Sequence, residues 1–289
     1  CYNHDQYMDG KCKPDVPTKD ILGVIDLLAV QQSIQQIEIT GGEPFLRCDI
    51  LAILDQISSK GIRIGIVSNA SMVNASLASE LAHRKISHVQ TTFLATDSIS
   101  HDALAGDGSF AARKAGVQHL VAAGVPVIGA FVCTRANYIR TGETMEMMYS
   151  WGMRESIFFM RFCPSRYSKR NRDRMAIGQE ELLVALTQAN SFGATHGIKI
   201  HNKIPIPACL VHSHDFPQII LSACGATLEG GDCYVDQRGN VRLCASNAEE
   251  LGNIRNASID DLLGSDAVRK WRATCAPDCS PCDLRSTCR

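Results

Sequence analysis

The residues most able to do chemistry in this chain are cysteines near its C-terminal end. The chain has 289 residues and 13 cysteines, and many of these lie late in the sequence: Cys224, Cys233, Cys244, Cys275, Cys279, Cys282 and Cys288. The last four are spaced C-x3-C-x2-C-x5-C, and such short loops bring thiolates onto one metal. A segment like this cannot bury enough apolar surface to fold alone, so ligation must stabilise it. The spacing suits structural zinc or an iron–sulfur cluster, and disulfides are a further alternative.

A second candidate site, Thr40-Gly41-Gly42-Glu43-Pro44, follows the first strong strand pattern. Two glycines allow a tight turn and a close approach of the backbone to a ligand. The Glu43 carboxylate could then accept hydrogen bonds from an ammonium group. A plain strand-to-helix turn with an acidic helix start would explain the same residues. Cys1 at the chain end adds little by itself.

The elements that must position these residues alternate between strands and helices. β-branched runs predict six strands, at residues 34–40, 62–69, 89–95, 125–134, 157–163 and 198–201. Apolar residues at helical spacing predict helices between them, at residues 49–60, 76–84, 110–123, 143–151 and 179–191. Such repeats imply right-handed parallel crossovers, hence an α/β domain with ligands at the carboxyl ends of its strands. Both an open doubly wound sheet and a partial barrel suit six units.

The alternation stops near residue 205, so we expect two domains, residues 1–205 and 206–289. Residues 233–244 predict a β-hairpin that turns at Gly239-Asn240. Residues 260–271 predict one helix, with Ser258 or Asp260 as its cap. Four scattered cysteines have apolar neighbours and are expected to be small core residues: Cys48, Cys133, Cys163 and Cys209.

Composition excludes some classes of partner. The chain carries 29 basic and 30 acidic residues, a formal net charge of −1, which gives no electrostatic footprint for nucleic acid or an anionic membrane. No apolar run is long enough to cross a bilayer. The expectation is therefore a cytoplasmic protein with no nucleic-acid or membrane partner.

Taken together, the motifs resemble one family. A cysteine and an aromatic residue, Cys1-Tyr2, precede a strand that ends in Gly-Gly-Glu-Pro, and a cysteine-rich tail follows the α/β domain. In this order and spacing the chain is similar to radical S-adenosylmethionine enzymes, in the subgroup whose C-terminal SPASM/twitch-type extension binds auxiliary iron–sulfur clusters. Further matching segments are Ser68-Asn69-Ala70, Thr96-Asp97, Phe131-Val132-Cys133-Thr134, Gly239-Asn240-Val241-Arg242-Leu243-Cys244 and Leu251-Gly252-Asn253-Ile254.

The sequence departs from the family pattern at both ends. The family's main cluster uses C-x3-C-x2-C, and only its last cysteine, Cys1, is present. The family tail also continues beyond Cys288. We therefore expect this chain to be a truncated piece of a longer protein. Where the family often has Ser-Leu-Asp, this sequence has Ala95-Thr96-Asp97, which puts one cofactor contact in doubt.

The resemblance implies a fold, a set of cofactors and their ligands. The fold would be a partial (β/α)6 TIM-like barrel followed by a small cysteine-rich domain with a β-hairpin and a helix. Cys1 would help hold a [4Fe-4S] cluster, and the seven late cysteines would hold one or two auxiliary iron–sulfur clusters. S-adenosylmethionine would be bound by Thr40, Gly41, Gly42, Glu43, Ser68, Asn69 and Asp97. The family also needs an electron donor such as flavodoxin or ferredoxin.

The resemblance further implies a reaction, and it leaves the substrate open. Reductive cleavage of S-adenosylmethionine would give a 5′-deoxyadenosyl radical that abstracts hydrogen from the substrate. Members with this tail often modify a peptide or protein side chain, which is the first hypothesis. The second is the same chemistry on a small molecule, such as a sugar or a cofactor precursor. The third is a zinc-stabilised α/β binding protein without radical chemistry.

Overall fold

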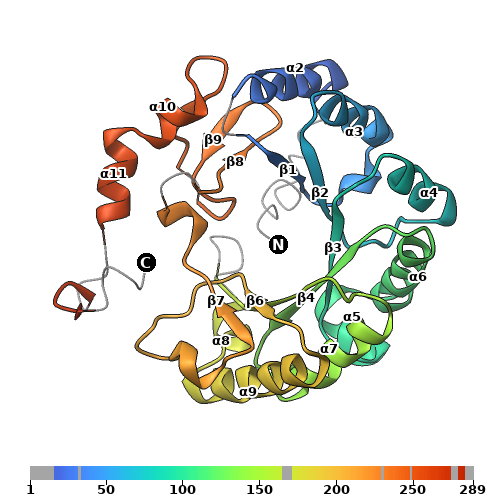
Figure 1. Ribbon diagram of the computed structural model, residues 1–289, viewed down its shortest axis with the longest axis vertical. Helices are drawn as coiled ribbons and strands as arrows, with labels where there is room; N and C mark the ends of the chain where they lie inside the picture. Colours follow the sequence, from blue (N-terminus) through green and yellow to red (C-terminus); the bar gives the residue numbers. More distant parts are fainter. Residues whose placement is uncertain are drawn as a thin grey trace.

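The computed structural model describes residues 16–31, 34–164, 171–228, 231–247, 249–274 and 279–283. Its main element is a parallel sheet whose strands follow one another in sequence order from β1 to β7. These strands are β1 (Gln36–Ile39), β2 (Arg63–Val67), β3 (His88–Phe93), β4 (Val127–Cys133), β5 (Ile157–Arg161), β6 (Ile200–Asn202) and β7 (Ile219–Leu221). The strands curve around a central space, and the helices lie outside them (Figure 1). This is a partial barrel, as expected from the sequence.

The helices that cover the sheet follow the predicted rhythm. They are α2 (Thr18–Ala29), α3 (Ile50–Ser59), α4 (Ala75–His83), α5 (Ser98–Ala105), α6 (Ser109–Ala122), α7 (Thr141–Ser150), α8 (Arg172–Met175) and α9 (Gln179–His196). All five predicted helices are present. The sequence analysis missed α2, α5 and α8, and it also missed β7. Because β7 pairs in parallel with β6, the sheet continues past residue 205, and the division into domains at that point stays a prediction.

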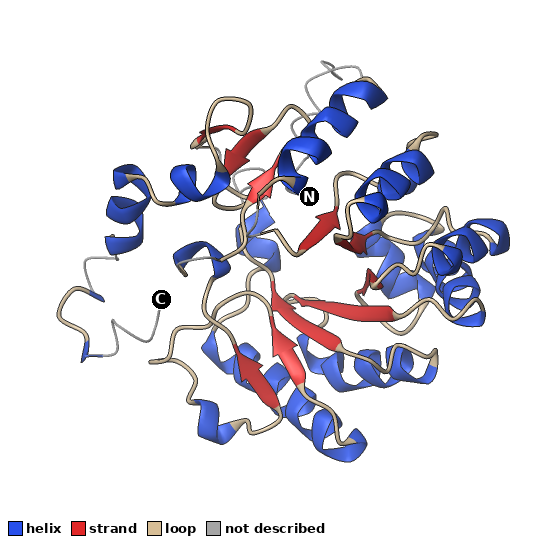
Figure 2. Cartoon of the chain, turned by 45° about the horizontal axis from the view of Figure 1, so that its top comes forward, coloured by secondary structure: helices blue, strands red, loops and turns tan. Residues whose placement is uncertain are grey.

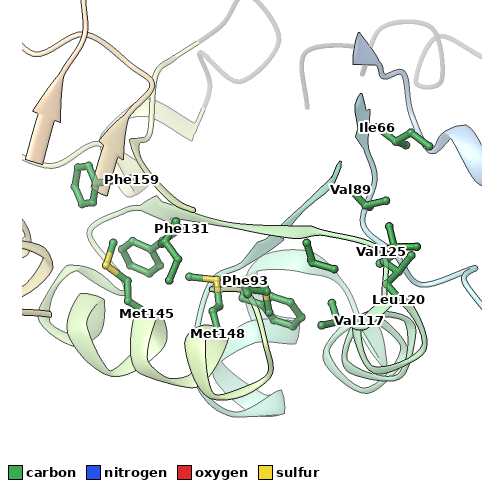
Figure 3. Close-up of a cluster of buried hydrophobic side chains, with 14 of the residues drawn as sticks. Ile66, Val89, Phe93, Val117, Leu120, Val125, Phe131, Met145, Met148 and Phe159 are labelled. Carbon is green, nitrogen blue, oxygen red and sulfur yellow. The ribbon is translucent and has the colours of Figure 1, made fainter. Parts of the chain in front are cut away.

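The core fills the space between the strands and the outer helices. Figure 3 shows Phe93, Phe131 and Phe159 from the strands packed with Met145 and Met148 of α7. On β3, buried Val89, Thr91 and Phe93 alternate with half-buried residues. Since successive side chains on a strand point to opposite faces, the alternate residues of β3 face the central space of the barrel. That space is called the lumen below.

The C-terminal segment forms a small separate sheet. Its strands are β8 (Tyr234–Val235), β9 (Asn240–Arg242) and β10 (Gly252–Asn253), and both pairings are antiparallel. The β8–β9 pair is the predicted hairpin. Its turn uses Gly239, whose φ of 86° is in the left-handed region, and the Asp236 side chain accepts hydrogen bonds from the Arg238 and Asn240 N–H groups.

The single helix predicted at residues 260–271 is wrong, because the structure has two. These are α10 (Ile259–Leu263) and α11 (Asp266–Ala273). Gly264 ends α10, and the Ser265 side chain accepts a hydrogen bond from the Val268 N–H, which starts a new helix. The expected cap at Ser258 is confirmed, since its hydroxyl accepts from the Asp261 N–H at 3.0 Å.

Helix α2 joins the C-terminal sheet to the barrel. Ile25 belongs to the barrel core, whereas Val24 and Leu28 on the same helix pack into a second cluster. That cluster also contains Val241, Leu243, Ile254, Ile259, Leu263 and Val268. In Figure 2 the small sheet lies beside α2, at the β1 side of the main sheet. None of the described helices is long and apolar enough to cross a membrane.

Helix α6 approaches the backbone of the turn after β2 closely at Gly116. A methyl group on Gly116 of α6 would overlap the carbonyl oxygen of Ala70. Gly116→Ala should therefore destabilise the protein by about 1–3 kcal/mol, the usual cost of overpacking. Gly23→Ala in α2 is the matched control, because nothing lies within 4 Å of its added methyl, and it should be neutral or stabilising by up to about 1 kcal/mol. Urea unfolding measures both, and equal effects would contradict the close contact.

His101 makes the stability of the barrel depend on pH. It is fully buried in contact with Phe93 and Phe110, and its Nε2 has no hydrogen-bond partner among the described residues. Burial, helped by the charge of Arg113, lowers the pKa of His101 below its usual 6.5. At pH values between the lowered pKa and about 6.5, the ring therefore stays neutral in the folded state, whereas it takes up a proton in the unfolded chain.

This contribution to stability is complete above about pH 6.5 and is lost as the pH falls from there toward the lowered pKa, by at most about 1.4 kcal/mol per pH unit. His101→Phe should flatten the dependence of melting temperature on pH between about pH 5 and 7. His83→Gln, an exposed histidine on α4, is the control. Parallel curves for wild type and His101→Phe would refute this assignment.

Candidate functional site

The carboxylate of Glu43 joins the loop after β1 to the loop after β2. Its Oε1 accepts a hydrogen bond from the Ser68 hydroxyl at 2.6 Å and one from the Phe45 N–H at 3.2 Å. Its Oε2 accepts from the Asn69 N–H at 2.8 Å. β1 and β2 are paired in parallel, so their carboxyl ends lie at the same edge of the sheet. The expected position of Glu43 at this edge is confirmed.

The Glu43 carboxylate can accept one more hydrogen bond beyond those from the described residues. A carboxylate offers about four acceptor positions, and three are occupied by protein groups, two of them on Oε1. The open position is on Oε2, and the side chain is partly exposed. An ammonium group such as the amino group of S-adenosylmethionine suits that position, because an ionised acceptor and a cationic donor form a strong, charge-assisted bond.

The turn after β2 is shaped around this carboxylate. The Ser68 hydroxyl also accepts from the Ala70 N–H at 2.9 Å, and the Asn69 side chain accepts from the Ser71 N–H at 2.8 Å. Ala70 is fully buried with a φ of 60°, a left-handed conformation that is unusual for any residue except glycine. These bonds hold the Asn69 N–H and the Ser68 hydroxyl toward Glu43.

The remaining residues of the Gly-Gly-Glu motif border open space. No atom of the described residues lies within 4 Å of a methyl group placed on Gly41, and Gly42 is exposed. Thr40 is half-buried directly after β1. The backbone here is therefore accessible to a ligand, which is what the two glycines suggested.

Asp97 lies at the carboxyl end of β3, but protein groups already occupy its oxygens. Its side chain accepts from the Ser100 N–H at 2.8 Å and caps the start of α5. It also forms an ion pair with Arg140 at 3.0 Å. The Ser100 hydrogen bonds, followed by Arg140, lower the pKa of Asp97. A cofactor-binding role for Asp97 stays a prediction, and the structure gives it a clear local role in ordering α5.

Arg113 is a polar residue near this site that the sequence analysis missed. From α6 its Nη1 donates to the Thr92 carbonyl at 2.9 Å. Burial lowers the pKa of Arg113, while the negative charges of Glu43 and Asp102 raise it. The guanidinium therefore places a positive charge in the electrostatic range of Glu43. Nothing in the sequence around Arg113 separates it from a surface arginine, because only the fold places it on the inner face of α6.

Three of the four scattered cysteines are not core residues, contrary to expectation. Cys133 is buried at the end of β4, where burial raises the pKa of its thiol to about 12. Cys48, Cys163 and Cys209 are exposed. Each of these lies in a loop that follows the carboxyl end of a strand, where apolar neighbours in sequence do not form part of the core.

The C-terminal cysteines are only partly within the described residues. Cys1, Cys275 and Cys288 lie outside them. Cys224 and Cys233 pack against the cluster that includes α2, and Cys244 is exposed just after β9. Cys282 donates its backbone N–H to the Cys279 carbonyl at 3.2 Å, which makes the C-x2-C segment a turn.

The described cysteines have the chemistry of soft metal ligands, although their grouping stays a prediction. Within the described part of the chain, no group of three or more His, Cys, Asp or Glu side chains is placed to hold a metal ion. Burial, with Asp232 nearby, raises the pKa of Cys233 to about 11. A metal would have to displace that proton, as metals do when a thiol coordinates them. Thiolates suit both zinc and iron–sulfur clusters.

Comparison with known proteins finds a peptide cyclase and a maturase among the relatives of this chain. The chain is 27% identical over 177 residues to a PqqA peptide cyclase of Streptomyces rochei, covering 54% of this chain and 49% of the relative. It is 27% identical over 145 residues to a mycofactocin maturase of Mycobacterium tuberculosis, covering 50% of this chain and 37% of the relative. The chain therefore matches half or less of the length of these curated relatives.

Solved structures share the fold at low sequence identity. Streptococcus suis SuiB bound to S-adenosylmethionine aligns with a TM-score of 0.71 and 16% identity, over 93% of this chain and 64% of that one. Native anSMEcpe with bound AdoMet, which is S-adenosylmethionine, aligns with a TM-score of 0.66 and 15% identity, over 94% of this chain and 79% of that one. These likenesses confirm the partial barrel with its small C-terminal sheet.

Two family models match the chain itself. Residues 224–288 match the SPASM iron–sulfur cluster-binding domain, and residues 1–150 match the radical SAM superfamily. These matches carry the cofactor assignment, S-adenosylmethionine with a [4Fe-4S] cluster for the first region and auxiliary iron–sulfur clusters for the second. With Glu43, Ser68 and Asn69 joined at the carboxyl edge of a partial barrel, the chain belongs to the radical SAM superfamily and carries a SPASM domain.

Proposed function

We propose that this protein generates a 5′-deoxyadenosyl radical from S-adenosylmethionine and uses it to abstract hydrogen from a peptide or protein side chain. The observation that carries the proposal is the open acceptor position on Glu43, held by Ser68 and Asn69 at the edge of the barrel. When bound, the iron–sulfur cluster supplies the electron for the cleavage. The protein supplies position and excludes water.

Each candidate residue has a part in holding the cofactor. Glu43 accepts a hydrogen bond from the amino group of S-adenosylmethionine, and Ser68 and Asn69 hold the carboxylate in place. Gly41 and Gly42 leave the backbone open beside it. Arg113 is the nearby cation available to the carboxylate of the cofactor. Cys1 ligates the [4Fe-4S] cluster, and the late cysteines ligate the auxiliary clusters.

A peptide is the favoured class of substrate because the names of several similar proteins point to peptides. The curated relatives are a peptide cyclase and a maturase. A structure of SuiB bound to precursor peptide SuiA aligns with a TM-score of 0.68, over 92% of this chain and 62% of that one. A small-molecule substrate is the second candidate, since a 21% identical AdoMet-dependent heme synthase of Nitratidesulfovibrio vulgaris matches over 86% of this chain. An external electron donor of the flavodoxin or ferredoxin type completes the proposal.

The role of Glu43 can be tested by cofactor binding. Glu43→Gln keeps the shape of the side chain but removes its charge, and it places an amide where the Asn69 N–H needs an acceptor. Affinity for S-adenosylmethionine should fall by about 10- to 100-fold, the effect of losing one charged hydrogen bond. Calorimetric titration measures this, with Glu80→Gln on α4 as the control. Unchanged affinity in Glu43→Gln would remove the residue from the cofactor site.

The auxiliary clusters can be tested by iron content. After anaerobic reconstitution, Cys224→Ser and Cys244→Ser should each bind less iron per chain than wild type, with weaker visible absorbance, because a lost thiolate opens the ligand set. Cys48→Ser, an exposed cysteine outside the tail, should leave the iron content unchanged. A colourless protein that binds only zinc would instead support the non-enzymatic alternative.

A further inference from the structure

Inside the barrel, away from the cofactor loop, the Glu38 side chain on β1 crosses β2 and contacts His88 on β3. Glu38 of β1, Gly65 of β2 and His88 of β3 are consecutive partners in the sheet register. The Glu38 Oε2 lies 3.2 Å from the His88 Nε2, so the carboxylate reaches over the whole width of β2. Neither residue contributes to the site around Glu43.

Glycine at position 65 makes this contact possible. A methyl group there would overlap both carboxylate oxygens of Glu38. Gly65 is buried and lies in a regular strand, so neither turn geometry nor a positive φ accounts for it. A glycine in a strand interior weakens the strand and marks a close approach. Here the group that approaches is the Glu38 side chain.

The Glu38–His88 pair faces the lumen. His88 is on the strand face opposite to Val89, Thr91 and Phe93, which pack against the helices. The Glu38 side chain is 41% exposed and the His88 side chain 16%. Glu38 precedes Thr40 by two residues, which sets it about 7 Å below the cofactor loop along the strand. The pair is therefore accessible from the space beneath the cofactor site.

The Glu38 carboxylate is ionised and has unused acceptor positions. It accepts hydrogen bonds from the Gln36 side chain and from His88, which leaves about two of its four acceptor positions without a partner among the described residues. Burial raises the pKa of Glu38, but the hydrogen bond and charge of His88, then the Gln36 hydrogen bond and last the charge of Lys203, together lower the pKa below its ordinary value.

An ammonium group lies on the other side of the lumen. Lys203 follows β6, and its Nζ lies 4.3 Å from the centre of the Phe158 ring on β5. The ring of His201, two residues earlier, contacts the same phenylalanine with centroids 6.0 Å apart. Among the described residues, no carboxylate is within 4 Å of the Lys203 ammonium. Its charge nevertheless acts on Glu38.

We propose that the lumen binds an uncharged amide group of the substrate, whose N–H donates to Glu38 and whose carbonyl accepts from Lys203. The side-chain amide of a glutamine or asparagine has this chemistry. A cationic group that pairs with Glu38 meets repulsion from Lys203, and an anionic group meets repulsion from Glu38. An amide satisfies both partners without bringing a net charge into the lumen. This assignment rests on the proposed peptide substrate and names which part of it enters the barrel.

Removing either charge tests the proposal, because it leaves the other charge uncompensated. Three capped tripeptides that differ only in a central glutamine, glutamate or lysine serve as probes. Their binding to the whole chain, reconstituted with its clusters, is measured by saturation-transfer NMR at low ionic strength. Wild type should prefer the glutamine peptide. Glu38→Gln should shift preference toward the glutamate peptide, and Lys203→Met toward the lysine peptide, each by about tenfold, or roughly 1.4 kcal/mol.

Matched controls separate the site from general charge effects. Glu80→Gln on α4 and Lys199→Met each remove a charge of the same sign outside the proposed amide site. The Lys199 Nζ donates to the Pro217 carbonyl. Neither should change the preference. Gly65→Ala keeps every charge but displaces the Glu38 carboxylate, so it should weaken binding of the glutamine peptide as Glu38→Gln does. A preference that Glu38→Gln or Lys203→Met leaves unchanged, or that the controls shift equally, overturns the proposal.

The same samples distinguish this inference from the proposed function. Binding of S-adenosylmethionine depends on Glu43 and should be equal in wild type, Glu38→Gln and Lys203→Met. Failure of wild type to bind S-adenosylmethionine would refute the cofactor assignment and leave the peptide preferences to be judged separately. Wild type that binds the cofactor but binds none of the peptides, or prefers a charged one, would refute the amide site alone.

Discussion

Three hydrogen bonds to the Glu43 carboxylate hold the candidate cofactor site together. Two of them, from Ser68 and Asn69, connect the loop after β1 to the turn after β2, and the third, from the Phe45 N–H, lies within the loop after β1. Such bonds are stronger than those between neutral groups. The left-handed Ala70 and the close approach of Gly116 on α6 belong to the same arrangement. The site thus depends on the packing of a helix whose own sequence carries no cofactor motif.

The two faces of the sheet differ in polarity. Toward the helices the strands present aromatic and branched side chains, such as Phe93 and Phe131, which pack against α6 and α7 (Figure 3). Toward the lumen they present Glu38, His88 and His201. These side chains are only partly buried, and each has a neighbour: Glu38 and His88 meet across Gly65, and the His201 ring contacts Phe158. A lumen with this polarity is suited to a polar substrate.

Helix α2 packs against both the barrel and the C-terminal cluster, and so connects the site around Glu43 to the SPASM domain. One part of it packs into the barrel, and another packs against the C-terminal cluster. At its start the Thr18 hydroxyl donates to Asp49, whose pKa is lowered to about 2 by Arg47 in the loop that follows Glu43. After its end, the Gln31 side chain accepts from the Ile259 N–H of α10. The SPASM domain is therefore held beside β1, the strand that leads to Glu43.

The sequence by itself determined the features that depend on local pattern and on spacing. Strand and helix periodicity predicted an α/β domain, the hairpin at Gly239 and the position of Glu43 at a strand end, because side-chain direction repeats with the backbone. The choice of a partial barrel over an open sheet came from the resemblance to a known family. Spacing also identified the cysteine-rich tail. Local pattern failed where the structure depends on longer contacts. The short strand β7 exists because it pairs with β6, and α2 because it packs into two cores. Cys48 and Cys163 are exposed because apolar neighbours in sequence are not neighbours in space.

Only the tertiary structure decided which polar groups meet. Glu38 and His88 are fifty residues apart and are brought together by sheet register, and Gly65 between them has no sequence signal that separates it from any glycine in a strand. The charge of Lys203, the residue after β6, acts on Glu38 because the sheet curves into a barrel. The charge of Glu43 acts on Arg113 because α6 packs against the turn after β2. These contacts join residues that are distant in sequence, and no periodicity in the chain encodes a distance between strands.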